Sequence, residues 1–93
     1  MSERSNAGYI ITSAIRVGDT EYVLGENPNA PARFVTWVCR NGSDYFWGRY
    51  TDDPLTALRN LLDRAGSALE VLERRQREEP IPKNAFFYAP PHK

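Results

Sequence analysis

This 93-residue chain has one cysteine, one histidine and a formal net charge of zero. The single cysteine, Cys39, excludes an intramolecular disulfide, and with only one histidine a structural zinc site lacks its usual ligands. No apolar run is long enough for a signal-peptide core or a membrane-spanning helix. We therefore expect a cytoplasmic protein with no metal, no cofactor and no membrane partner.

Charge of one sign is also lacking. Twelve Lys and Arg side chains balance twelve Asp and Glu side chains, and the balance holds in each half of the chain. A dedicated nucleic-acid arm or a polybasic membrane anchor needs a local basic excess, which this chain does not have. What the chain does have is eleven aromatic residues, a 41% apolar share and a length that suits one small domain.

Residues 9–26 indicate a first β-hairpin. Residues 9–17 are rich in β-branched side chains that roughly alternate with polar ones. Gly18 and Asp19 suit a two-residue turn of type II′. This turn places Arg16 opposite Glu21, an oppositely charged cross-strand pair. One face of the hairpin is then mainly apolar and carries Ile11, Ile15, Val17, Tyr22 and Leu24.

Residues 34–40 and 44–50 form the strongest strand pattern, and Asn41-Gly42 between them predicts a second hairpin. A loop of two or four residues places odd positions of the first strand beside even positions of the second. One face then carries Val35, Trp37, Cys39, Phe46, Gly48 and Tyr50, and the other carries Phe34, Thr36, Val38, Arg40, Tyr45, Trp47 and Arg49. Both faces are apolar enough to need cover. We expect a helix on the first face, which leaves the second without assured cover.

Residues 53–79 predict that helix. Asp53 supplies a capping oxygen and Pro54 suits the first helical position. Apolar side chains recur at spacings of three and four as one stripe: Leu55, Leu58, Leu62, Ala65, Leu69 and Leu72. Gly66 followed by Ser67-x-x-Glu70 is compatible with a break and restart, so one long helix and a helix broken at Gly66 both stay open. In either form Leu69 and Leu72 need a partner beyond the sheet, either the tail or another chain.

Residues 80–93 predict an extended tail. Pro80 ends the helix, and the aromatic cluster at 85–88 precedes Pro90-Pro91. Burial of three adjacent aromatic side chains is favourable, so we expect the tail to dock on a sheet edge or on the helix. A tail that is disordered until it meets a partner is the alternative.

These patterns together predict a single α+β domain with a four-stranded antiparallel sheet made of two hairpins over residues 9–50. One long or Gly66-broken helix over residues 53–79 packs on one face. Residues 1–8 are a flexible N-terminus and residues 80–93 the tail. The predicted core is Ile11, Ile15, Tyr22, Leu24, Val35, Trp37, Phe46, Leu55, Leu58, Leu62 and Ala65.

No set of residues in the sequence has the pattern of a catalytic site. Cys39 is expected to be a buried strand residue, and His92 lies near the end of the chain, where its geometry is hard to hold. Asp52 and Asp53 are adjacent carboxylates, but a helix cap accounts for them better than a general acid–base pair. We therefore predict a protein that is not an enzyme.

The surplus of apolar surface favours a protein-interaction or regulatory module. The predicted binding residues share the uncovered sheet face: Phe34, Val38, Arg40, Tyr45, Trp47 and Arg49. Tryptophan, tyrosine and arginine dominate the energetics of protein interfaces, and an apolar patch of this kind marks interaction surfaces. The partner is another protein or a second copy of the chain. Small charge-balanced domains of this kind are common among accessory factors and inhibitors of phages and mobile elements, an analogy of class only.

Two other interpretations of the same face stay open. The aromatic cluster at 86–88 could fold back and cover the face. Alternatively, aromatic side chains beside Arg40 and Arg49 could stack the bases of single-stranded nucleic acid, as a nucleic-acid-binding module does. The zero net charge argues against this second interpretation, because phosphate neutralisation normally brings a basic excess.

Overall fold

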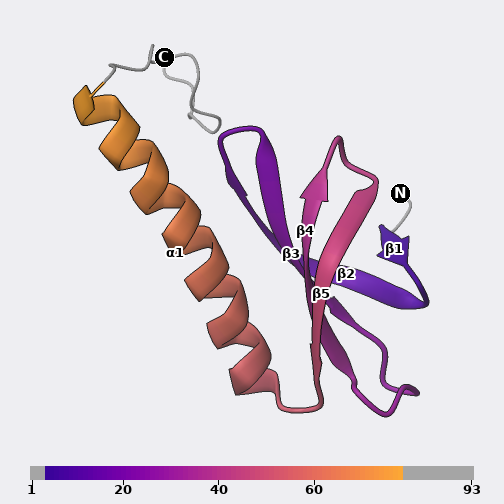
Figure 1. Ribbon diagram of the computed structural model, residues 1–93. Coiled ribbons are helices and arrows are strands. Elements are labelled where there is room, and N and C mark those ends of the chain that lie inside the picture. The colour runs from indigo at the N-terminus through magenta and orange to yellow at the C-terminus, as the bar shows by residue number, and fades with distance from the viewer. Residues whose placement is uncertain (1–3, 79–93) are drawn as a thin grey trace, which may run out of the picture.

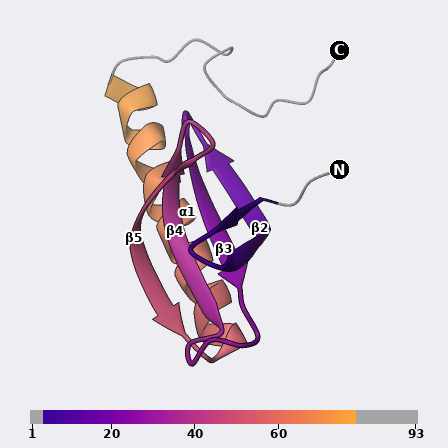
Figure 2. The ribbon, with the colours of Figure 1, turned by 90° about the vertical axis from the view of Figure 1, so that its right-hand side faces the viewer.

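The described part of the chain is an antiparallel sheet followed by one helix. The computed structural model describes residues 4–78. Its elements are β1 (Ser5–Asn6), β2 (Tyr9–Val17), β3 (Thr20–Glu26), β4 (Phe34–Arg40), β5 (Asp44–Thr51) and α1 (Pro54–Glu78). The five strands lie in sequence order in one curled sheet, and α1 packs along one side of it (Figures 1 and 2). The predicted α+β fold is confirmed, with one strand more than predicted because Ser5–Asn6 pairs with the start of β2.

The β2–β3 hairpin has the predicted turn and the predicted register. Gly18 takes a positive φ of 65° in the turn, and Arg16 lies opposite Glu21. Their side chains nevertheless bond elsewhere: Arg16 Nε donates to the Gly18 carbonyl oxygen at 3.2 Å, and Glu21 pairs with Arg4. A bulge at Thr12 shifts the register between Ile11 and Ser13. Ile11 therefore lies on the opposite face from Ile15, and the prediction that both share one face is wrong.

The β4–β5 hairpin departs from the predicted facing at two points. Arg40 pairs with Asp44, so the loop between the strands has three residues, 41–43. The prediction assumed a loop of two or four residues. Residues 44–46 therefore point to the face opposite the one predicted for them. A second irregularity follows, since two residues of β5, Trp47 and Gly48, lie opposite the single residue Trp37. This bulge restores the predicted facing for 49–51.

Helix α1 begins as predicted and continues through Gly66. The Asp53 carboxylate accepts a hydrogen bond from the Thr56 backbone N–H at 2.9 Å, which is the expected N-cap contact, and Pro54 is the first helical residue. Of the two open possibilities at Gly66, the structure has the unbroken helix, 25 residues from Pro54 to Glu78. The predicted tail lies outside the described residues.

The helix covers the sheet face that was predicted to be free. Ala57 and Leu61 pack on Leu24 of β3, with Phe34, Tyr22 and Ile15 around them, and we call this side of the sheet the helix face. The buried stripe of α1 is Ala57, Leu61 and Ala65, of which only Ala65 belongs to the predicted stripe. Because two of these three residues are alanines, the helix backbone can lie close to the sheet while the larger leucines remain at its flank.

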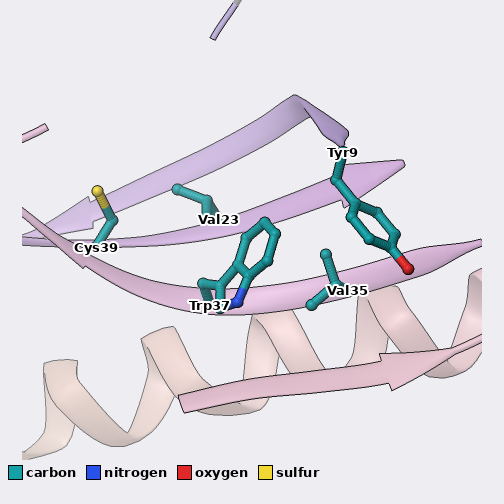
Figure 3. Packing of buried hydrophobic residues seen from close by; sticks show 5 residues of the cluster. All are labelled: Tyr9, Val23, Val35, Trp37 and Cys39. Carbon is teal, nitrogen blue, oxygen red and sulfur yellow. The ribbon is translucent and has the colours of Figure 1, made fainter. Parts of the chain in front are cut away.

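The opposite side of the sheet, the inner face, closes on itself without the helix. Tyr9, Val23, Val35, Trp37 and Cys39 form its buried cluster, and Figure 3 shows their side chains on the side of β4 away from α1. Tyr9, Tyr45 and Tyr50 surround the Trp37 ring, with centroids 5.6–6.3 Å from its own. The curl of the sheet therefore builds a second core from strand residues alone.

The predicted core is correct in part. Leu24, Val35, Trp37 and Ala65 are buried, whereas Ile11, Ile15, Tyr22 and Phe46 are only half-buried. Leu55, Leu58 and Leu62 are exposed, so their assignment to the core is wrong. The reason is the rotation of α1 that brings Ala57 and Leu61 to the sheet.

Candidate interaction groove

A groove of about 620 Å³ runs between the middle of α1 and the β5 side of the helix face. We call it the groove. Strands β3 to β5 supply one wall and two successive turns of α1 supply the other. Its lining combines apolar side chains with three arginines and one carboxylate: Thr20, Tyr22, Val38, Arg40, Trp47, Gly48, Arg49, Asp63, Arg64, Ser67, Ala68 and Val71.

The most exposed aromatic side chain at the groove is Trp47, with 73% of its surface open to solvent. The β5 bulge holds it there in a left-handed backbone conformation, with φ of 57°. Phe46 supports it from the side, since the two rings meet edge to face with centroids 5.0 Å apart. A left-handed conformation is unusual for a large side chain and is most often found where the surrounding structure imposes it.

Arg64 of α1 reaches across the groove to the same bulge. Its Nη2 donates to the Trp47 carbonyl oxygen at 2.6 Å. Its Nη1 is buried and has no hydrogen-bond partner among the described residues. Burial, and then the positive charge of Arg49, lower the pKa of the Arg64 guanidinium, while Tyr22 acts weakly in the opposite direction. Within the described residues, Arg64 therefore has one terminal nitrogen that is hydrogen-bonded and one buried nitrogen that has no acceptor.

The two remaining arginines flank this position. The Arg40 guanidinium lies 5.8 Å from the centroid of the Phe46 ring, a cation–π distance, and Arg49 is exposed. Among residues 4–78, Asp63 is the one carboxylate in the lining, so three positive charges face one negative charge there. The groove is therefore locally cationic although the chain as a whole is neutral.

The structure brings four of the six predicted binding residues together: Val38, Arg40, Trp47 and Arg49 all line the groove. Phe34 lies on the same face but packs in the cluster around Leu24, Ala57 and Leu61. Tyr45 lies on the inner face, because the three-residue loop pairs it with Cys39. The prediction of one shared face is therefore wrong for Tyr45.

The helix wall of the groove was missed in the sequence. Arg64, Ser67, Ala68 and Val71 recur at spacings of three and four, which places them along one side of a helix. The neighbouring stripe of leucines has the same spacing and is more apolar. Only the rotation of α1 shows which of the two stripes borders the sheet.

Tyr45 instead belongs to a polar cluster on the inner face. Arg4 donates to both carboxylate oxygens of Glu21 at 3.0 and 3.2 Å, to the Tyr45 hydroxyl at 3.1 Å and to Cys39 Sγ at 3.5 Å. The hydrogen bond to Glu21 is the main cause that raises the pKa of Arg4. Burial, and then the negative charge of Glu21, raise the pKa of the Cys39 thiol. A buried thiol with a raised pKa is a poor nucleophile, so this cluster has a structural character.

Comparisons with known protein families, with curated proteins and with solved structures find no match for this chain. Within residues 4–78, no three His, Cys, Asp or Glu side chains lie together in a way that could hold a metal ion. No helix in that range combines the length and the hydropathy needed to cross a bilayer. His92 lies outside the described residues.

Proposed function

We propose that this chain is a non-enzymatic protein-interaction module, and that its partner docks into the groove between α1 and β5. The observation that carries the proposal is Trp47: a tryptophan held 73% exposed, in a left-handed bulge, above a groove that holds three arginines. Tryptophan and arginine are the residues most enriched at interface hot spots. A location in the cytoplasm stays a prediction from the single cysteine.

The backbone of Trp47 supports a role outside the chain's own packing. A left-handed conformation costs a residue with a side chain about 1–2 kcal/mol. In the described structure the Trp47 ring packs mainly on Phe46 and covers little else, so its own burial offsets only a small part of this cost. A partner that buries the ring would supply the missing apolar contact.

The arginines indicate the chemistry of the partner. Arg40 and Arg49 are exposed, whereas Arg64 Nη1 is buried and has no acceptor among residues 4–78. A segment that offers carboxylates to Arg40 and Arg49 and an apolar side chain to Trp47 matches the exposed side chains of the groove. We therefore expect an extended peptide segment with acidic and apolar residues.

Selection of peptides from a random display library on the full chain tests this proposal. Binding peptides should be enriched in acidic and apolar residues, and Trp47→Ala should weaken their binding by at least about tenfold, or 1.4 kcal/mol. Leu55→Ala is the matched control, because Leu55 is equally prominent on the surface but lies outside the groove. If both variants bind the peptides as the unchanged chain does and remain folded, the groove is not the binding site. A variant that ends after Glu78 shows whether the chain's own aromatic segment at 86–88 competes for the groove, since binding would then tighten.

A second candidate function is the binding of single-stranded nucleic acid. The observation that favours it is the local charge, three arginines beside one exposed tryptophan. Bases stack on such rings in single-strand binders, and the affinity falls as salt rises. Trp37 is buried, so quenching of tryptophan fluorescence by short oligonucleotides at low salt would report on Trp47. A signal that is absent at low salt, or that persists in Trp47→Phe, removes this candidate.

A further inference from the structure

The flank of α1 opposite the groove carries a row of solvent-exposed leucines. Leu55 is 75% exposed, and Leu58, Leu62 and Leu69 are 45–49% exposed. We call these four residues the leucine face. None of them lines the groove. Figure 1 shows that α1 has the sheet on one side only, and the four leucines keep 45–75% of their surface open to solvent within the described structure.

Gly66 lies in the middle of this flank, and the described chain gives no reason for a glycine there. Glycine in a helix interior is less stable than alanine, because its backbone loses more freedom on folding. A Cβ added at Gly66 would meet no described atom within 4 Å, and its φ is not left-handed. A helix that tolerates a glycine at such a position commonly does so because another backbone approaches closely.

One pair of oppositely charged residues lies at equal distances on either side of Gly66. Arg59 lies seven residues before Gly66 and Glu73 lies seven residues after it, both at two helical turns. Together with Leu62 and Leu69 they follow the spacing 3-4-3-4 along one line of the helix. If a second α1 crosses antiparallel at Gly66, each Arg59 faces Glu73 of the other copy. The leucines at 62 and 69 then interdigitate on either side of the crossing.

We propose that the chain forms a two-fold symmetric dimer through the leucine face, in which the two α1 helices cross antiparallel at Gly66. The glycine permits close approach at the axis, the leucines supply the apolar contact, and two Arg59–Glu73 pairs fix the direction. A two-fold interface uses the same surface on both copies, which a self-complementary charge pattern of this kind satisfies. The zero net charge of the chain removes the general repulsion between copies. This inference is independent of the groove, which remains open in such a dimer.

Sedimentation equilibrium of the full chain over about 1 µM to 1 mM tests the proposal, a range that spans weak and strong association. The expected result is a mass twice that of one chain at the upper end. Leu62→Glu should raise the dimer dissociation constant by at least about tenfold. The proposal is overturned if the full chain stays monomeric throughout this range. It is also overturned if only a chain truncated after Glu78 forms a dimer.

Gly66→Ala separates a dimer contact from a purely local role. The added methyl group should raise the melting temperature of the monomer, measured at low concentration by circular dichroism. The same change should weaken the dimer by at least about tenfold. If Gly66→Ala dimerises as tightly as the unchanged chain, the crossing at Gly66 is wrong.

The charge pairs provide a test by exchange. Arg59→Glu and Glu73→Arg should each weaken the dimer, and the double variant should restore it. Arg75→Glu makes the same change in charge as Arg59→Glu, but on the opposite side of α1, and should leave the dimer unchanged. Loss of dimer in this control, or no recovery in the double variant, overturns the antiparallel arrangement.

Discussion

The two faces of the sheet differ in how completely the chain satisfies its own polar groups. On the inner face Arg4 has three acceptor groups, and the Tyr9 hydroxyl donates to the Ala32 carbonyl oxygen at 2.6 Å. On the helix face two buried polar atoms, Thr36 Oγ1 and Arg64 Nη1, have no partner among residues 4–78. Within residues 4–78 the buried side-chain polar atoms of the inner face therefore all have partners, whereas two on the helix face do not.

The two faces differ in hydrogen bonding because different elements pack over them. The inner face is covered by the curled sheet itself, which follows its own curvature and brings Tyr9, Tyr45 and Tyr50 around Trp37. The helix face is covered by one helix, which contacts β2, β3, β4 and β5 without filling the space towards the β5 bulge. A partner can be recognised only where the cover is incomplete.

The largest effect is expected from removal of the inner-face ring. Trp37→Ala should lower the free energy of unfolding by about 3–5 kcal/mol, because Trp37 is almost fully buried and its ring contacts three tyrosine rings. Leu61→Ala is the matched change on the helix face and should cost less, about 2–3 kcal/mol. Urea denaturation at constant pH measures both. A larger loss for Leu61→Ala would mean that the helix face is the principal core. If Trp37→Ala does not fold, the milder pair Trp37→Phe and Leu61→Val should give the same ranking at smaller magnitude.

A smaller effect is expected from adding one methyl group to the inner face. A Cβ at Gly48 would lie 2.8 Å from Trp37 Nε1 and 3.0 Å from Tyr50 Cε1. Gly48→Ala should therefore lower the free energy of unfolding by about 1–3 kcal/mol, since the buried Trp37 ring has little room to move. Gly66→Ala, whose Cβ meets nothing within 4 Å in the described chain, is the control and should not destabilise the monomer. Equal melting temperatures for Gly48→Ala and the unchanged chain would show that the inner face is loosely packed.

The smallest effect is a gain on the helix face. Thr36 is fully buried and its hydroxyl has no partner within the described structure, so Thr36→Val should raise the free energy of unfolding by about 1 kcal/mol. Thr20→Val is the matched control, because the Thr20 hydroxyl donates to Asp19 Oδ1 at 3.2 Å and its loss should destabilise the chain. Chemical denaturation distinguishes the two signs. A destabilised Thr36→Val would show that the Thr36 hydroxyl has a partner in solution.

The sequence was sufficient for four of the five strands and for the helix. It was insufficient for β1, which lies in residues predicted to be a flexible N-terminus, and for the facing of the strands. The β-branched runs, Gly18 and Asn41-Gly42 predict both hairpins, and Asp53 with Pro54 predicts where α1 begins, because these are local preferences of the backbone. A three-residue loop and a loop of two or four residues have similar local energies, and so do a bulged and a regular strand at Trp47. Tertiary packing decides between these alternatives. For this reason Tyr45 was assigned to the wrong face.

The strand residues of the groove were predicted from the sequence, whereas its helix residues were not. Val38, Arg40, Trp47 and Arg49 were predicted because they share a strand pair rich in aromatic residues. Arg64 was not predicted, because two stripes of α1 have helical spacing and the more apolar one faces outward. The small side chains of Ala57 and Ala65 allow the backbone of α1 to approach the sheet closely, and this decides which side of the helix faces the sheet. The spacing of apolar residues in the sequence does not reveal this packing preference.

The extra residue in β5 also has a consequence for inheritance. Strand β4 places one residue where β5 places two, and the pairs on both sides of that point are regular. Loss of a single codon at position 47 or 48 would leave all of those pairs in register and turn the remaining residue towards Trp37. The exposed tryptophan and the groove beneath it can therefore be gained or lost in one genetic step, while the rest of the sheet keeps its pairing.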